Sequence, residues 1–360
     1  MTKRKALVIT DGLLDDTHAK TCHGLLRGSE RFEVVGIIDH VHAGKDAAQV
    51  VPNVAPGVPV FATLESALEQ GGISPECLII GIATEGGVLP GHLRDVVLAA
   101  IQAGLNIVNG LHETLGDDPV IGQAAAQAGV EIHDIRKPKS FRDLHFWDGS
   151  ILDVACPIIA VLGIDCAVGK RTTAKLLTQA LAARGLTAEM IYTGQTGWML
   201  GYEYGFIFDA TPNDFVSGEM EHAIVSCWNE RRPDIIFLEG QSALRNPSGP
   251  CGSEYLLSAN ARAVILQHPV GREYYIGCEN LGCRLPTVAQ EIELIGMYGA
   301  ETLAISLNAS QVSRSESEAT AKQLQSQINL PVTDPFQDLE PLVEAVLNYT
   351  RTFTHNGVPQ

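Results

Sequence analysis

The segment of residues 160–173 most constrains the fold of this chain, because it joins an apolar strand to a helix through a glycine-bounded loop. Residues 158–162 form an unbroken apolar run, typical of a buried parallel strand, and apolar residues recur at helical spacing after Thr173. Gly163 and Gly169 allow the loop backbone to turn its N–H groups inward, and Lys170 opens the helix. This order of elements predicts a P-loop that binds the phosphate groups of a ligand.

The loop departs from the usual P-loop pattern at two positions. Five residues, 164–168, separate its glycines where four are usual, and Arg171 follows the lysine where Ser or Thr is usual. The five-residue spacing and the Val-Gly-Lys ending resemble the loop of dethiobiotin synthetase. The alternative is a pair of glycines that only turn a strand into a helix. We expect Lys170 to face solvent before a ligand binds. The predicted cofactor-binding residues of the loop are Gly163, Asp165, Gly169, Lys170, Arg171, Thr172 and Thr173.

Length, composition and charge limit the class of protein. A chain of 360 residues exceeds what one hydrophobic core usually serves, so two domains are expected. The net charge is −17 and no basic stripe is present, which argues against nucleic acid as a partner. No apolar run reaches the roughly 18 residues that span a bilayer, and the eight cysteines show no zinc-like spacing. We expect a cytoplasmic protein that binds a small-molecule substrate, has no membrane contact and forms a homo-oligomer.

The first part of the chain alternates between strand and helix patterns. Such alternation predicts a Rossmann-like, doubly wound parallel sheet, which we assign to residues 1–150. The predicted strands are 6–9, 34–39, 78–82, 106–108 and 131–135, and the predicted helices lie near 19–26, 64–69, 93–103 and 121–128.

The first predicted strand lacks the G-x-G-x-x-G motif that binds dinucleotides. Asp39 ends the second strand, where a dinucleotide fold places the acid that binds ribose, but a structural role is the alternative. We expect this domain to contribute substrate contacts through polar groups at its strand ends, among them Asp11, Asp39 and His112. Roles as turn formers and capping groups are equally open for these three residues.

The second part of the chain alternates in the same way after a break at residues 136–156, which we interpret as a linker. It predicts a P-loop NTPase-like parallel sheet domain, residues 151–360. The predicted strands are 158–162, 188–192, 235–238, 263–267 and 302–307, followed by a helical region around 339–347.

Polar residues follow several of these strands. Glu239 ends an apolar strand, the pattern by which P-loop proteins present a carboxylate near Mg²⁺, so Thr172 and Glu239 are the metal ligands if Mg²⁺ is used. Asn308 closes the last strand without the Asn-Lys-x-Asp motif of guanine-specific proteins, which favours an adenine-containing ligand and makes Asn308 a candidate for its base edge. His268 and Arg272 follow another strand, and Asp214 lies in a segment that we expect to be a loop.

The loop, Glu239-Gly240-Gln241, residues 267–272 and residues 109–112 together resemble one family over nearly the whole chain. This is the DgcN-like family, long known as a domain of unknown function, in which a Rossmann-like domain precedes a P-loop domain. Members are assigned as D-glutamate N-acetyltransferases that use acetyl-CoA. The resemblance therefore implies that the loop holds the phosphates of an adenine-containing acyl donor.

Three functions remain open at this stage. An N-acetyltransferase would hold acetyl-CoA on the loop and transfer acetyl to an acidic amino acid such as D-glutamate. An ATP- and Mg²⁺-dependent ligase or kinase would bind ATP there, and a nucleotide-responsive regulator would have no chemistry. The predicted catalytic residues are Lys170, Glu239, Asp214 and His268, and the predicted substrate-binding residues are Thr196, Gln241, Arg245, Arg272 and His112.

Overall fold

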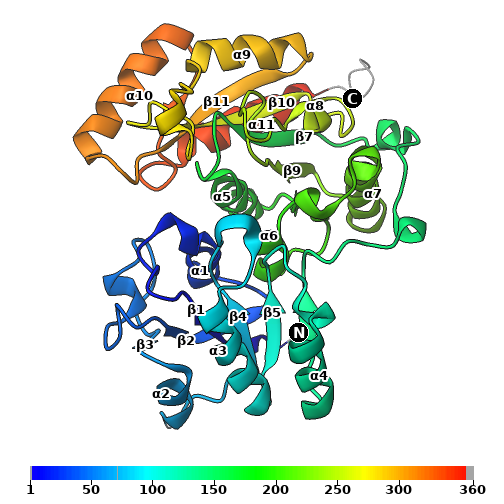
Figure 1. Cartoon of the computed structure of the whole chain (residues 1–360). Helices are drawn as coiled ribbons and strands as arrows, with labels where there is room; N and C mark the ends of the chain where they lie inside the picture. Colours follow the sequence, from blue (N-terminus) through cyan, green and yellow to red (C-terminus); the bar gives the residue numbers. More distant parts are fainter. Residues whose placement is uncertain (1, 71, 354–360) are drawn as a thin grey trace. The chain divides into compact units, whose positions relative to one another are not determined.

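The computed structural model, which describes residues 2–70 and 72–353, divides the chain into two compact units, each with its own sheet (Figure 1). Unit 1 is Met1–Lys139 with Gln195–Tyr202, and unit 2 is Ser140–Gly194 with Glu203–Gln360. The boundary between the two units therefore lies after residue 139, whereas the sequence pattern placed it after residue 150. The helix α6 (Gln195–Leu200) was also expected in the second domain but belongs to unit 1.

Unit 1 is a six-stranded parallel sheet with the order β3-β2-β1-β4-β5-β6. This is the strand order of a dinucleotide-binding fold, and it confirms the predicted Rossmann-like architecture. The strand β3 was not predicted, because two residues are too few to show a period. The elements of unit 1 besides α6 are β1 (Arg4–Ile9), α1 (Lys20–Leu26), β2 (Phe32–Ile38), β3 (Val60–Phe61), α2 (Leu64–Glu69), β4 (Cys77–Ile80), α3 (Gly91–Gln102), β5 (Asn106–Asn109), α4 (Pro119–Ala128) and β6 (Ile132–Asp134).

Unit 2 is a second six-stranded parallel sheet, with the order β12-β11-β10-β7-β9-β8. It confirms the predicted P-loop class of fold and adds the short strand β12. Its elements are β7 (Ile158–Gly163), α5 (Lys170–Ala182), β8 (Ala188–Ile191), α7 (Asn213–Arg231), β9 (Ile235–Glu239), α8 (Ser253–Leu256), β10 (Ala263–Pro269), α9 (Val288–Met297), β11 (Glu301–Asn308), α10 (Arg314–Ile328), β12 (Val332–Thr333) and α11 (Glu340–Thr352).

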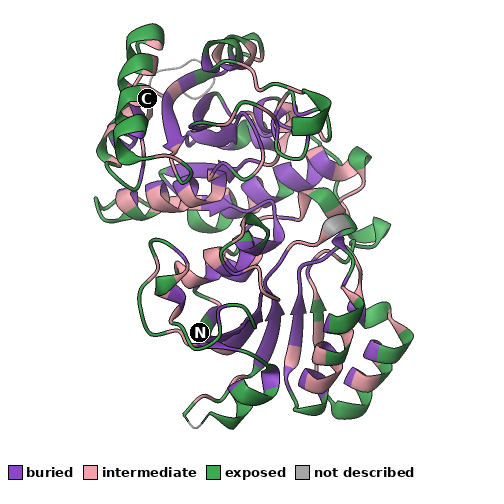
Figure 2. Cartoon of the chain, turned by 60° about the vertical axis from the view of Figure 1, so that its left-hand side comes forward, coloured by how far each residue is buried: buried purple, intermediate pink, exposed green. Residues whose placement is uncertain are grey.

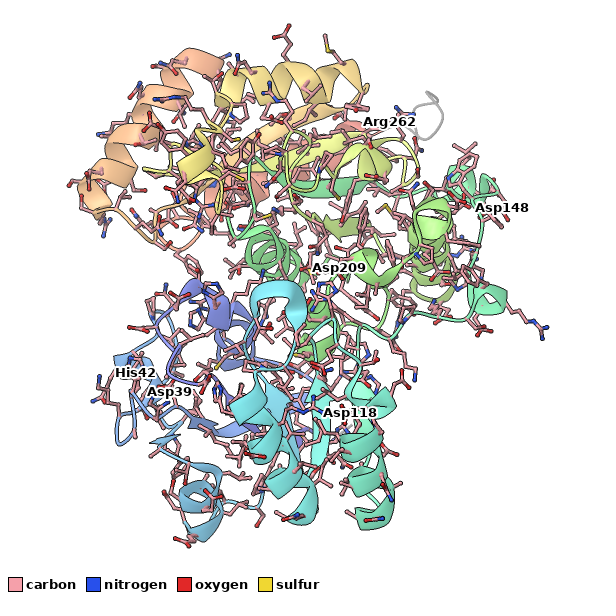
Figure 3. All side chains as sticks on the ribbon, viewed as in Figure 1. Asp39, His42, Asp118, Asp148, Asp209 and Arg262 are labelled. Atoms are coloured by element: carbon pink, nitrogen blue, oxygen red, sulfur yellow. The ribbon has the colours of Figure 1, made fainter. Side chains whose placement is uncertain are left out.

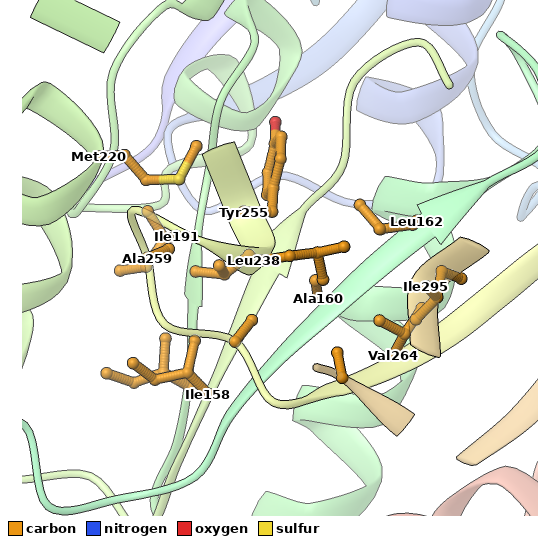
Figure 4. Packing of buried hydrophobic residues seen from close by; sticks show 14 of the residues in the cluster. Ile158, Ala160, Leu162, Ile191, Met220, Leu238, Tyr255, Ala259, Val264 and Ile295 are labelled. Carbon is orange, nitrogen blue, oxygen red and sulfur yellow. The ribbon is translucent and has the colours of Figure 1, made fainter. Parts of the chain in front are cut away.

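The central strands of both sheets are buried on both faces, as expected when helices cover each side (Figure 2). In unit 2, one face packs against α7, α8 and α9 through residues such as Leu162, Val264 and Tyr255 (Figure 4). The helices α5 and α11 contact the strands from the other side. Successive residues of a strand face opposite sides, so every second residue of β10 lies on the side of the sheet that α5 and α11 cover.

The segment after Lys139 is not a linker between the units but part of unit 2. The buried Glu219 of α7 accepts hydrogen bonds from the backbone N–H (3.0 Å) and Nδ1 (2.8 Å) of His145. The buried Glu221 accepts the N–H groups of Asp148, at 2.8 Å, and of Gly149, at 2.9 Å. Two carboxylates of one helix therefore fix this segment to unit 2, which moves the boundary toward the N-terminus.

Candidate phosphate-binding site

The loop between β7 and α5 has the backbone of an anion cradle. Ala167 (φ 54°) and Gly169 (φ 100°) adopt the left-handed conformation, and no side chain caps the helix at Gly169. At Gly163 a Cβ atom would lie 2.6 Å from Cγ2 of Val168, so only glycine fits there. Within the described residues, no acceptor pairs with the N–H groups of residues 167–169, 171 and 172. These donors are available for the oxygens of a bound phosphate.

Asp165 stabilises the conformation of the loop, whereas the sequence predicted that it contacts the cofactor. Its carboxylate is fully buried. One oxygen accepts the N–H of Cys166 at 2.7 Å and Nδ2 of Asn246 at 3.2 Å. The other accepts Nη1 of Arg272 at 2.8 Å and the N–H of Ile276 at 2.9 Å. With both oxygens used, Asp165 has no acceptor position left for a ligand, and its role in the described structure is to position the loop.

Lys170 is buried rather than solvent-facing, contrary to our expectation from the sequence. Its side chain is only 7% exposed. The Nζ atom donates to the carbonyl oxygens of Asp165 and Ser242, each at 2.7 Å. Ser242 has a φ of 39°, which is uncommon for a residue other than glycine. The lysine therefore stabilises both the loop and the segment after β9, and a phosphate would have to compete with these two carbonyl groups.

Arg171 lies next to the carboxylate that ends β9. Its Nη1 atom is 3.5 Å from Oε1 of the buried Glu239, whose Oε2 accepts the N–H of Thr193 at 3.1 Å. Burial raises the pKa of Glu239, and the positive charge of Arg171 partly opposes this shift. The residue that departs from the usual P-loop pattern thus supplies a positive charge beside the acid.

A magnesium ion held by Thr172 and Glu239 does not fit this arrangement. The guanidinium of Arg171 lies 3.5 Å from one oxygen of the Glu239 carboxylate, and a backbone N–H binds the other oxygen. Thr172 is half-buried in the first turn of α5. Across residues 2–70 and 72–353, no group of three or more His, Cys, Asp or Glu side chains is placed to hold a metal ion.

The ends of β10, which pairs with β7, and of β11, which pairs with β10, complete the site. Ser306 of β11 lies 3.2 Å from the hydroxyl of Thr173, so Thr173 serves packing between α5 and the sheet. Asn308 ends the same strand, and its Nδ2 atom lies 3.9 Å from the point that a Cβ of Gly169 would occupy. Gln267 of β10 places Oε1 at 3.5 Å from that point. Asn308 was predicted at this site, whereas Gln267 was not singled out as a site residue.

His268 was predicted as a catalytic residue, but its position on β10 places it on the opposite face of the sheet from Gln267. It follows Gln267 directly and therefore faces the opposite side of the sheet, the side of Val264 and Leu266. Burial lowers its pKa to about 4, and its Nδ1 atom has no partner within the described residues. The half-buried, neutral imidazole thus lies on the face of the sheet opposite Gln267.

The two arginines predicted to bind substrate carboxylates are both engaged in the protein. Arg272 binds Asp165 and also the carbonyl oxygen of Cys166, at 2.8 Å. Arg245 donates from Nε to the buried Glu291 at 2.7 Å. These contacts assign both guanidinium groups to holding unit 2 together, because a buried carboxylate left without its cation is strongly destabilising.

The remaining predicted residues do not gather at the loop. Gln241 donates to the hydroxyl of Thr193 at 3.0 Å and lies near Glu239. Asp214 is exposed in the first turn of α7, a helix that replaces the expected loop. Thr196 is buried on α6 in unit 1, with its hydroxyl 3.1 Å from that of Thr21. His112 is exposed in unit 1 and lies against Gly87.

In unit 1, the carboxylate that a dinucleotide fold would use to bind ribose is already hydrogen-bonded within the protein. Asp39 is fully buried and lies beside His42 (Figure 3). It accepts the hydroxyl of Thr10 at 2.7 Å, the N–H of Leu14 at 3.1 Å, and both the N–H and Nδ1 of His42 at 3.0 and 2.9 Å. Burial raises its pKa, but these hydrogen bonds outweigh that effect and leave the pKa below its usual value. Of the two roles left open for Asp39, the described contacts favour the structural one.

No helix in the described part of the chain is both long enough and apolar enough to cross a membrane.

Comparisons with known proteins match this two-unit architecture. A family model described as the DUF1611 P-loop domain matches residues 145–343, and one described as the DUF1611 Rossmann-like domain matches residues 40–138. Proteins named D-glutamate N-acetyltransferase from Tritonibacter scottomollicae and a Pseudoalteromonas species are 29% and 27% identical over 280 residues, covering 76% of this chain and 81% of each relative.

A crystal structure of a DUF1611 family protein from Anabaena variabilis is similar over 96% of this chain and 100% of its own, with a TM-score of 0.87 and 27% identity. The family resemblance that the sequence motifs suggested is thereby confirmed. The chain belongs to the DUF1611 family, in which a Rossmann-like domain precedes a P-loop domain.

Proposed function

We propose that this chain is an N-acetyltransferase that transfers the acetyl group of acetyl-CoA to the amine of D-glutamate. In this proposal the P-loop of unit 2 binds the phosphates of the donor. The names of the two relatives support the reaction and the acceptor. The unpaired N–H groups of the loop, together with Lys170 and Arg171, support binding of a polyanion.

The observation that carries the choice of donor is the ion pair of Arg171 and Glu239 at 3.5 Å. An enzyme that transfers a phosphoryl group needs Mg²⁺ to neutralise charge that develops on the phosphates. CoA is held by its phosphates while its thioester reacts, so a guanidinium and backbone N–H groups suffice for binding. A cationic cradle without a fitting metal site is therefore suited to a CoA ester more than to ATP hydrolysis.

The reaction has a simple balance of bonds and protons. The amine nitrogen forms a bond to the acetyl carbon, and the bond from that carbon to sulfur breaks. The ammonium form of the amino acid gives up two protons, of which one passes to solvent and one ends on the departing thiolate. The products are N-acetyl-D-glutamate, CoA thiol and a proton.

The long pantetheine arm separates the phosphates of acetyl-CoA from the thioester. Lys170 and Glu239 lie at the phosphate end of a donor bound in this way, so their proposed role is binding rather than proton transfer. Lys170 exchanges its two carbonyl partners for phosphate oxygens, and Glu239 positions Arg171 beside them.

The test is an acetyl-transfer assay that follows thiol release from acetyl-CoA in excess EDTA, with D-glutamate, L-glutamate or no acceptor. We expect release that depends on D-glutamate and persists in EDTA, and an N-acetyl product in the mass spectrum. ATP hydrolysis that requires Mg²⁺, with no use of acetyl-CoA, would contradict the proposal and favour the ATP-dependent alternative.

The variant Glu239→Gln separates binding from catalysis at this site. It keeps the shape of the side chain but removes the charge that holds Arg171. We expect the KM for acetyl-CoA to rise about tenfold, the equivalent of one partly buried charge contact, with kcat within a few-fold of wild type. A large loss of kcat at unchanged KM would instead identify Glu239 as the general base.

A further inference from the structure

Gln267 combines two properties that the packing of unit 2 does not explain. Its side chain is only 1% exposed, at the end of β10. Its Nε2 atom is buried and has no hydrogen-bond partner within the described residues. A buried amide donor without an acceptor is a net cost to the folded chain, and such groups are rare in native proteins. An acceptor absent from the polypeptide itself would remove this cost.

The position of Gln267 indicates where that acceptor would lie. Its Cβ atom is 3.2 Å from the point that a Cβ of Gly163 would occupy, and its Oε1 is 3.5 Å from the corresponding point at Gly169. The side chain therefore extends along the P-loop from its first glycine to its last. Its carboxamide lies at the N-terminus of α5, among the loop N–H groups that lack acceptors.

Two other buried polar atoms of unit 2 that have no partner within its described residues do not share this position. Nδ1 of His268 is on the opposite face of β10, because successive residues of a strand alternate. Oγ1 of Thr302 is near the start of β11, at the opposite end of that strand from Asn308. Of these three atoms, only Nε2 of Gln267 belongs to a side chain that reaches the uncapped N-terminus of α5.

We propose that Gln267 is a ligand-binding residue of the P-loop site, whose Nε2 donates a hydrogen bond to an oxygen of a bound diphosphate group. This inference rests on the proposed phosphate-binding role of the loop and extends it to the strand beside β7. The class of ligand is a diphosphate, which CoA, adenine nucleotides and inorganic pyrophosphate share. A neutral donor adds direction to the binding, since it fixes one oxygen without adding charge.

The test compares Gln267→Met, which keeps the length of the side chain and removes the donor, with Gln267→Glu, which places a negative charge at the same position. Thr302→Val is the matched control, because it removes a buried, unpartnered polar atom of the same sheet at a distance from the loop. Each full-length variant is titrated calorimetrically with inorganic pyrophosphate, CoA and ATP in EDTA, and melted with and without ligand.

We expect Gln267→Met to weaken binding about tenfold, the loss of one good hydrogen bond to an anion. Its melting temperature without ligand should equal or exceed that of wild type, because the unpartnered donor is gone. Gln267→Glu should weaken binding about a hundredfold through repulsion of the phosphates. Thr302→Val should bind every ligand like wild type.

Wild-type affinity of Gln267→Met for all three ligands would overturn the inference, and so would a wild-type chain that binds none of them. Weakened binding of pyrophosphate and ATP in a chain that ignores acetyl-CoA would support the role of Gln267 while contradicting the proposed acetyl transfer. The binding measurement therefore tests the role of Gln267, and the transfer assay separately tests the proposed acetyl transfer.

Discussion

The two units share an architecture but use the polar groups at the carboxyl ends of their strands differently. In unit 1 these groups bind one another: Asp39 accepts four hydrogen bonds, and Asp11 lies 2.7 Å from His92. In unit 2, Gln267 at the end of β10 keeps a buried side-chain donor, Nε2, that has no partner within the described residues. The strand-end side chains of the two sheets thus differ in whether their polar atoms have partners, and a buried polar atom without a partner indicates a ligand site more specifically than the fold does.

The largest expected effect comes from the two buried aspartates that stabilise these edges. Asp165→Ala would leave the guanidinium of Arg272 without its carboxylate partner and two backbone N–H groups without their acceptor. Loss of one partner from a buried ion pair costs about 3–5 kcal/mol. Asp39→Ala should also destabilise the chain, by about 3 kcal/mol, because it leaves buried donors unpaired. Calorimetric melting curves measure both effects.

Ligand binding by the same two variants sharpens the comparison. Titrations with CoA at low temperature, after circular dichroism has shown that the fold is retained, should find weakened binding for Asp165→Ala and wild-type affinity for Asp39→Ala. Equal weakening by both substitutions would show that the edge of unit 1 also takes part in binding the donor.

The second prediction concerns His268 of unit 2, which differs from His42 of unit 1 in its contacts. His42 binds Asp39, whereas Nδ1 of His268 has no partner among the residues that the structure describes, and burial lowers the pKa of His268 to about 4. The unfolded chain binds this proton below about pH 6.5 and the folded chain only near pH 4, so His268 makes stability fall as the pH falls between these values. The expected contribution is about 3 kcal/mol, from 1.36 kcal/mol per pKa unit.

Urea unfolding of wild type and His268→Leu at pH 7, 5.5 and 4.5 measures this contribution. The variant should lose less stability than wild type between pH 7 and pH 4.5. The exposed His40 provides the control, since His40→Gln should keep the wild-type pH dependence. Identical slopes in His268→Leu and wild type would mean that His268 does not contribute in this way.

The third prediction concerns Lys170, which has both a structural and a binding role. Lys170→Ala should weaken binding of CoA or pyrophosphate about a hundredfold, near 2.7 kcal/mol. It should also lower the stability of the chain without ligand by about 1–3 kcal/mol, because the buried carbonyls of Asp165 and Ser242 lose their donor. Lys322→Ala, on the exposed side of α10, should change neither quantity. Unchanged affinity for every phosphate ligand would rule out the P-loop as the site.

The sequence was sufficient to predict the layers of both units, because buried parallel strands appear as apolar runs and the helices between them keep their period. It also located the loop and the acid at the end of β9. The short strands β3 and β12 were missed, because two residues carry no pattern. The helix α7 was mistaken for a loop at its start, since Gly218 and buried acids interrupt its apolar face.

The roles of individual site residues were less predictable, since they depend on contacts that are distant in sequence. Asp165 looked like a ligand-binding acid, but its partners Asn246, Arg272 and Ile276 come from segments far along the chain. Gln267 and His268 are neighbours in sequence, and only the register of β10 decides which of them faces α5. The signal that could have favoured Gln267 is the alternation of β10 relative to Gly163, its partner on β7.

The most direct test of this account is hydrogen exchange of the full-length chain with and without acetyl-CoA, in EDTA, followed by mass spectrometry of peptides. We predict slowed exchange in peptides that contain residues 163–173, because no acceptor among the described residues pairs with the N–H groups of residues 167–169, 171 and 172. Peptides that contain the strand ends of unit 1, residues 10–15 and 39–44, should exchange unchanged, with acetyl-CoA and with NAD. Protection of these unit 1 segments, with none in the loop, would contradict the account.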